Sequence, residues 1–176
     1  MHERSVSKRA IYDGRVIHVE LHDVELADGK TAKRELVRHP GAVAIVPLDA
    51  DHQVLLVQQF RFAAGRSLLE IPAGTLEPGE APDLCAEREL REEIGYRPGR
   101  LEPLGGIYAA PGYTTEFIHL YVARDLTLDP LAMDADEDIH IVRLPLVAAL
   151  EKIESGEIID GKSVAGLLRT ARRLGV

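Results

Sequence analysis

Two strongly apolar runs limit the folds that this chain can adopt. Residues 42–48 read AVAIVPL and residues 54–60 read VLLVQQF, and the polar stretch DADHQ separates them. Short apolar runs that are rich in β-branched residues and bounded by turn signals are typical of buried strands. A third run, LLEI at 68–71, ends at Pro72, which cannot donate a hydrogen bond to a sheet. We therefore expect a core built around a sheet.

The first forty residues have a more polar character. VIHVELHDVEL at 16–26 and KTAKRELVRH at 30–39 are rich in β-formers, and the dipeptide DG between them is a turn signal. We expect a β-hairpin that forms an edge or lies against another surface. The HPG boundary signal then divides the chain into an N-terminal β region, residues 1–40, and a main domain, residues 41–176.

Three later segments show helical spacing of their apolar residues. Proline in the first turn and glycine directly after the last turn are typical helix boundaries. The predicted helices run from Pro82 to Gly95, from Pro145 to Gly156, and onward from Ser163 as a candidate N-cap. Strand-like stretches at 116–123 and 139–144 lie between the first two helices. This order predicts a mixed β-sheet sandwiched between helices, in the α/β or α+β class, with an N-terminal antiparallel β region.

Composition argues against several classes of function. The 176 residues carry a formal net charge of −8, which disfavours binding to nucleic acid or to an anionic membrane surface. No apolar run is long enough to cross a bilayer, and the N-terminus lacks a signal-peptide pattern. Cys85 is the only cysteine, so we expect a small core residue and a reducing, cytoplasmic setting. An acidic protein that handles anionic phosphates needs metal cations as intermediaries.

The segment ERELREEIG at 87–95 concentrates four glutamates on a predicted helix. Like charges three and four residues apart on a helix repel by roughly 0.2–0.5 kcal/mol per pair. Glu89, Glu92 and Glu93 share one face of that helix, whereas Glu87 points away. Such a face is stabilised by a divalent cation, and oxygen ligands favour Mg²⁺ or Mn²⁺ over zinc. The alternative is a solvated acidic face that neighbouring arginines partly balance.

The spacing around these glutamates resembles the Nudix box, G-x5-E-x7-R-E-U-x-E-E-x-G-U, in which U is apolar. Residues 74–96 read GTLEPGEAPDLCAERELREEIGY and depart from it only at Tyr96, where the family usually has an aliphatic residue. Seven fixed letters coincide by chance at roughly 10⁻⁷ per starting position. The matching residues are Gly74, Glu80, Arg88, Glu89, Leu90, Glu92, Glu93 and Gly95.

This resemblance implies a mixed sheet between helices and the metal-dependent hydrolysis of a nucleoside diphosphate linked to another moiety. Mg²⁺ is the expected cofactor, with Mn²⁺ as its substitute. In the family, the glutamates that match Glu89 and Glu93 bind metal, and the one that matches Glu92 often assists them. The backbone carbonyl at the position of Ala73 is a further ligand in relatives.

Two other box positions are expected to support these ligands. A bidentate guanidinium fixes a carboxylate rotamer, so the arginine that matches Arg88 is expected to hold a carboxylate such as Glu80 rather than substrate. Gly74 allows the backbone to approach a ligand or side chain closely.

A second resemblance narrows the substrate. Family members that cleave ADP-ribose to AMP and ribose 5-phosphate tend to carry a proline about sixteen residues after the last box glycine, where this chain has Pro111. The stretches EIPAGTLEPGE and QQFRFAAG are also similar to that subgroup. The resemblance implies that Pro111, Gly112 and Glu116 contact the substrate. It also implies a homodimer in which residues 1–40 form the contact.

Two more roles follow from the resemblance, each with an alternative. An arginine at the position of Arg61 contacts the substrate's phosphates or ribose in the subgroup, and the alternative is a solvent-exposed arginine at a strand end. Relatives often use a glutamate on a late acidic loop as the general base, and Glu137 is the only glutamate of MDADEDI at 133–139. If the register differs by two residues, the matching position is Ala135 and another residue is the base. The alternative for Glu116 is a surface glutamate at the start of a strand, and the alternative for Glu137 is a merely solvated acidic loop.

Two other functions stay open at this point. Another nucleotide-sugar or dinucleotide pyrophosphatase would carry the same box, because the box supplies metal ligands and does not select the leaving group. A module that senses a nucleotide without cutting it is an alternative of another class. Loss of a box glutamate would mark such a module, and every one is present here.

Overall fold

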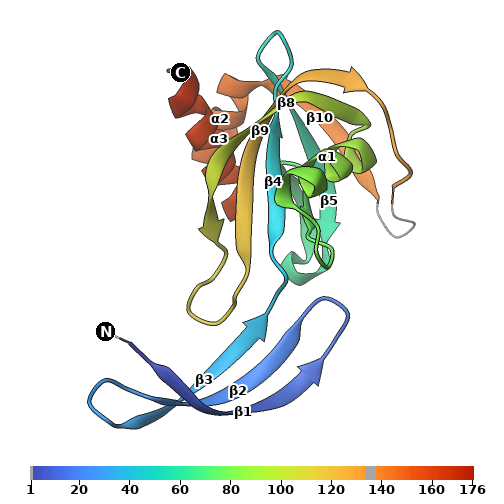
Figure 1. Ribbon diagram of the computed structural model, residues 1–176. Coiled ribbons are helices and arrows are strands. Elements are labelled where there is room, and N and C mark those ends of the chain that lie inside the picture. The colour runs from blue at the N-terminus through green and yellow to red at the C-terminus, as the bar shows by residue number, and fades with distance from the viewer. Residues whose placement is uncertain (1, 134–137) are drawn as a thin grey trace. The chain divides into compact units, whose positions relative to one another are not determined.

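The computed structural model in Figure 1 describes residues 2–133 and 138–176. The chain forms two compact units. The first contains residues 1–41 and 108–117, and the second contains residues 42–107 and 118–176. The sequence did not predict that residues 108–117 belong to the first unit.

The first unit contains a three-stranded antiparallel sheet in the order β1-β2-β3. Its strands are β1 (Arg4–Asp13), β2 (His18–Glu25) and β3 (Thr31–Arg38). Strands β2 and β3 confirm the predicted hairpin. The loop that follows residue 108 lies along β3, because Val37 N–H donates to the Tyr113 carbonyl at 2.7 Å and Thr115 N–H donates to the Val37 carbonyl at 3.0 Å.

The second unit contains a four-stranded sheet and a three-stranded sheet. The first has the order β7-β4-β9-β8, and the second has the order β10-β5-β6. Strand β4 pairs parallel to β9 and antiparallel to β7, so the larger sheet is mixed. The strands are β4 (Ala42–Pro47), β5 (Gln53–Arg61), β6 (Arg66–Glu70), β7 (Ala73–Thr75), β8 (Tyr96–Tyr108), β9 (Phe117–Leu128) and β10 (Ile139–Pro145), with the short helix η1 (Phe62–Ala64) between β5 and β6.

Helices cover both faces of β4 (Figure 1). They are α1 (Pro82–Glu93), α2 (Leu146–Glu154) and α3 (Gly161–Leu174). On one face, Ala44 belongs to the same buried cluster as Ala149 of α2 and Leu167 of α3. On the other face, Val43 packs in a cluster with Leu90 of α1. The predicted sandwich of a mixed sheet between helices is therefore confirmed.

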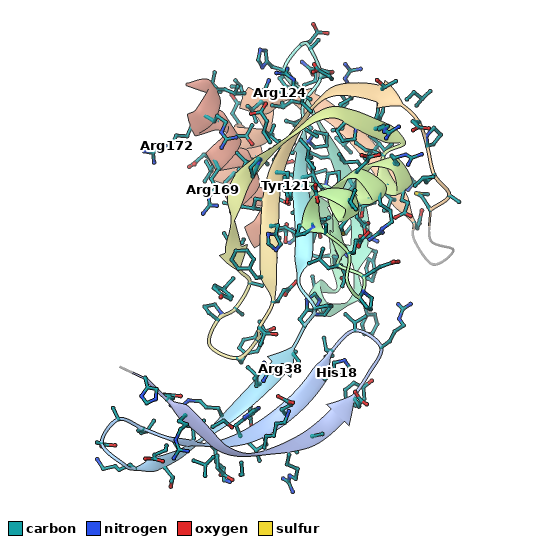
Figure 2. The ribbon with its side chains drawn as sticks, in the orientation of Figure 1. His18, Arg38, Tyr121, Arg124, Arg169 and Arg172 are labelled. Carbon is teal, nitrogen blue, oxygen red and sulfur yellow. The ribbon has the colours of Figure 1, made fainter. Side chains whose placement is uncertain are left out.

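The expected cap of the last helix was wrong. Asp160, and not Ser163, is the N-cap of α3, since its carboxylate accepts the Ser163 N–H at 3.0 Å. The Ser163 hydroxyl is fully buried and accepts the Ile71 N–H at 2.9 Å, which is a tertiary contact. In the second half of α3, Arg169 donates to the carbonyl of Leu104 in β8 at 3.0 Å, and Figure 2 shows this side chain.

None of the helices within residues 2–133 and 138–176 combines the length and the apolar character that a membrane crossing requires.

Candidate active site

Helix α1 carries the acidic residues of the box and begins and ends where the sequence predicts. Pro82 occupies its first turn, and Gly95 takes a φ of +77° directly after the cap at Ile94. Its apolar side, including the fully buried Cys85 and Leu90, packs in one cluster with residues of β4. This packing fixes the rotation of the helix and places its glutamates against the edge strand β7.

Two glutamates of α1 are buried against β7. Glu89 and Glu93 keep only 8% and 4% of their surface exposed. The Ala73 N–H donates to Oε2 of Glu93 at 3.1 Å. The carboxyl group of Glu89 lies where a side chain at Gly74 would be, because a Cβ there would stand 1.9 Å from its Cδ. The box glycine thus makes room for the box glutamate.

Arg88 connects three carboxylates in this region. Its Nε and Nη2 donate to the two oxygens of Glu80 at 2.9 and 3.0 Å, as the predicted bidentate contact requires. Its Nη1 donates to Glu89 at 2.7 Å and to Glu92 at 2.9 Å. The hydrogen bond from Arg88 lowers the pKa of Glu80 to about 2 from a usual value of 4.5. One guanidinium cannot neutralise three carboxylates, so the group keeps a net negative charge.

This donor set fits a divalent cation. Among the described residues, no three acidic, histidine or cysteine side chains converge on one point as metal ligands. Arg88 holds one oxygen each of Glu89 and Glu92. Two buried carboxylates beside a glycine and excess negative charge are nevertheless the environment that hard cations such as Mg²⁺ stabilise. Buried charge of this kind is costly unless a partner compensates it.

Arg61 is anchored rather than free at its strand end. Its Nε and Nη2 donate to the two oxygens of Glu70 at 2.9 and 2.7 Å. The pKa of Arg61 is raised, first by these hydrogen bonds and further by the charges of Glu93 and Asp160. The guanidinium therefore lies within the electrostatic field of the buried box residue Glu93. Its contact with substrate stays a prediction.

Sequence reasoning missed Glu70 and Lys162. The Lys162 ammonium also donates to Glu70, whose side chain is almost wholly buried. A charged residue inside the apolar run LLEI was an available signal for Glu70. Nothing comparable marked Lys162, because 92 residues separate it from its partner.

The other predicted residues belong to the first compact unit or lie outside the described residues. Pro111, Gly112 and Glu116 belong to the first compact unit, where the Ala109 N–H donates to the Glu116 carbonyl at 3.1 Å. Glu137 lies outside the described residues. The roles assigned to these four residues stay predictions.

Known proteins are similar to this chain in sequence and in fold. The chain is 39% identical over 165 residues to the ADP-ribose pyrophosphatase of Bacillus subtilis (strain 168), covering 93% of this chain and 89% of that protein. It is 42% identical over 164 residues to the methanol dehydrogenase activator of Bacillus methanolicus, covering 92% and 89%. A crystal structure of an ADP compounds hydrolase aligns with a TM-score of 0.88 at 26% identity, covering 99% of this chain and 95% of that one.

The family pattern described as the NUDIX domain matches residues 37–165, which include the whole box and both buried glutamates. This match spans well over half of the 176 residues. This chain therefore belongs to the Nudix hydrolase family.

Proposed function

We propose that this chain hydrolyses the pyrophosphate bond of ADP-ribose to give AMP and ribose 5-phosphate, with Mg²⁺ as its metal. The observation that carries the proposal is the burial of Glu89 and Glu93 against the strand that contains Gly74. The likeness to an ADP-ribose pyrophosphatase over nearly the whole chain supports the choice of substrate.

The box residues would hold the metal. Glu89 and Glu93, assisted by Glu92 and the Ala73 carbonyl, are the proposed ligands. When bound, a divalent cation neutralises charge on the diphosphate and helps to orient or ionise the attacking water. Arg88 has a different task, since its contacts restrict the rotamers of the carboxylates that it touches.

The remaining residues would bind substrate and move the proton. Arg61 contacts the anionic diphosphate through a guanidinium that Glu70 orients. Pro111, Gly112 and Glu116 contact the rest of the substrate. Water attacks one phosphorus atom while the bridging P–O bond breaks, and the Glu137 carboxylate accepts the proton that the water loses.

We also propose that the protein is a cytoplasmic homodimer. The first-unit sheet supports the dimer, because every residue of β1 is exposed and its apolar side chains lack cover among the described residues of one copy. A reducing compartment fits a chain whose only cysteine is buried and unpaired.

A substrate profile tests the activity. Product release is measured with ADP-ribose, GDP-mannose, NADH and diadenosine polyphosphates, each with and without Mg²⁺. Preference for ADP-ribose that depends on Mg²⁺ supports the proposal. Preference for another compound assigns the chain to a different pyrophosphatase group. Tight binding of ADP-ribose without product after long incubation indicates a sensing module instead.

A further inference from the structure

A buried carboxylate connects Arg61 to the start of the last helix. Glu70 is the final residue of β6 and keeps 1% of its surface exposed. A buried carboxylate is stable only when hydrogen-bonded cations compensate its charge. Arg61 supplies two hydrogen bonds, and the ammonium of Lys162 supplies a third, to the oxygen that Arg61 Nη2 also contacts. One carboxylate is therefore shared between two cations.

Arg61 and Glu70 form one charged group with Lys162 and Asp160. The charges of this group determine how much positive potential Arg61 presents to a ligand. Lys162 also donates to Asp160 at 2.9 Å, so two cations and two carboxylates balance one another. Arg61 is the most solvent-exposed of the four side chains, at 38%, whereas Lys162 keeps 13%. Burial raises the pKa of Glu70, but the hydrogen bond from Arg61 and the charge of Lys162 together outweigh it and lower the pKa.

The residue after Lys162 binds the segment that leads into the box. Ser163, one residue after Lys162, accepts the Ile71 N–H at 2.9 Å. The next backbone groups along the chain are also bound: the Pro72 carbonyl accepts the Ile45 N–H at 2.8 Å, and the Ala73 N–H donates to Glu93. A continuous path thus runs from the first turn of α3 to the buried Glu93 of α1.

We propose that Lys162 is a positioning residue, which acts through Glu70 to hold the Arg61 guanidinium in place and to leave it enough positive charge to bind the substrate's diphosphate. This inference rests on the proposed function, since it needs Arg61 to contact substrate. Without Lys162, Glu70 alone neutralises Arg61, and the group with Asp160 gains one net negative charge. In the box itself, Arg88 donates to Glu80, Glu89 and Glu92, and the Ala73 N–H donates to Glu93.

Calorimetric binding of a methylene-bridged ADP-ribose analogue in Mg²⁺ is the primary measurement. We expect Lys162→Met, which keeps the apolar stem, to weaken the Kd by about tenfold, less than the loss of a charge that contacts the ligand directly, because Lys162 acts through Glu70. Lys162→Arg should restore the Kd to within about threefold, because it returns the charge. Lys152→Met is the matched control, since Lys152 pairs with Glu157 away from this group.

A double-mutant cycle tests whether Lys162 acts through Glu70. Glu70→Gln should weaken binding by itself, because Arg61 loses the carboxylate that orients it. Adding Lys162→Met to it should change the Kd by less than about twofold, since coupled residues are not additive. Full additivity of the two changes would overturn the proposal. Turnover of ADP-ribose adds a second readout: KM should rise in Lys162→Met, while kcat changes by less than about threefold. A lower melting temperature with unchanged KM and Kd indicates a purely structural lysine and contradicts the proposal.

The proposed function and this inference fail in different ways. If the wild-type protein binds the analogue but releases no product from ADP-ribose, the proposed activity is wrong and the Kd comparison still decides the role of Lys162. If the wild-type protein cuts ADP-ribose and the Kd of Lys162→Met matches wild type, only the inference fails. If the wild type neither binds nor cuts, both fail. Should Lys162→Met not fold, the Glu70→Gln/Lys162→Met protein, which removes both charges, is compared with Glu70→Gln by the same measurement.

Discussion

A Cβ atom on Gly74 would lie 1.9 Å from the carboxyl carbon of Glu89, closer than two unbonded carbon atoms can approach. The backbone of Gly74 does not take a left-handed φ, so conformation alone would permit another residue. Space is therefore the reason for glycine at this position. The first residue of the box and a proposed metal ligand fifteen residues later form a single packed contact.

Gly74→Ala should impair catalysis more than folding. The new methyl group has to displace the Glu89 carboxylate, and displacement of a positioned group by about 1 Å can cost about 100-fold in rate. We expect kcat to fall by about that factor. Steady-state kinetics checks this, with Gly161→Ala as the control, because no atom lies within 4 Å of a Cβ there. If Gly74→Ala has the wild-type kcat, the Glu89 carboxylate can be displaced without loss of turnover.

Loss of Arg88 should change how stability depends on pH. The contact with Arg88 lowers the pKa of Glu80 to about 2 from 4.5. A carboxylate with a lowered pKa stabilises the fold fully above its unfolded pKa, and this contribution disappears as pH falls through the folded value. The melting temperature of Arg88→Met, measured in chelator, should therefore lie furthest below wild type above pH 4.5, and the gap should shrink toward pH 2. A gap that widens with acid would contradict the assignment.

Glu93→Gln should separate activity from stability. Glutamine keeps an acceptor for the Ala73 N–H, so the fold should survive, and removal of one like charge from the acidic face offsets part of any loss. Loss of a metal ligand should lower the rate by at least about 10³-fold, or roughly 4 kcal/mol of barrier. Product release in Mg²⁺ checks the rate, and thermal melting checks the fold.

Glu87→Gln is the matched control for this experiment. Glu87 lies on the same helix but pairs with Arg97 at 2.9 Å, as its predicted direction away from the acidic face requires. Its turnover should stay close to wild type. Equal losses in Glu87→Gln and Glu93→Gln would assign the effect to helix charge in general and not to a metal ligand.

The features that sequence predicted are those that depend on local spacing. The residues of α1 lie one turn apart, so their common face follows from helix geometry alone. Arg88 reaches back along the first turns of α1 to Glu80, which lies eight residues earlier, a spacing that the box already contains. Strand β4 and the first half of β5, residues 54–57, appear as apolar runs, because the residues on both of their faces are buried.

The features that sequence missed depend on tertiary contacts. Strand β1 has no buried residue, so no alternation of apolar and polar side chains marks it. Asp160 and Ser163 are both good helix caps, and the choice between them follows from the contact of Ser163 with Ile71. Lys162 and Glu70 meet across 92 residues, a separation that no local pattern records.

Glu137→Gln tests the proposed general base. Glutamine cannot accept the proton that the attacking water loses, so turnover in saturating Mg²⁺ should fall by about 10²–10⁴-fold, the usual contribution of such a group. KM should change little, because a base acts in the transition state. Glu116→Gln is a useful companion, since a residue that contacts substrate should raise KM more than it lowers kcat. Turnover of Glu137→Gln near the wild-type value would mean that another residue is the base.

The homodimer prediction is tested on strand β1. Val6, Ile11 and Tyr12 of this strand are more than half exposed, an arrangement that a second copy of the sheet would cover. We expect light scattering to report a dimer at micromolar concentration, and Ile11→Asp to shift it toward monomer, because a charge buried in an apolar interface is costly. Val147→Asp places the same charge on an equally exposed apolar residue of α2 and should leave the mass unchanged. A wild-type monomer at that concentration would refute the dimer. If both variants remain dimers, the dimer interface lies elsewhere than on β1.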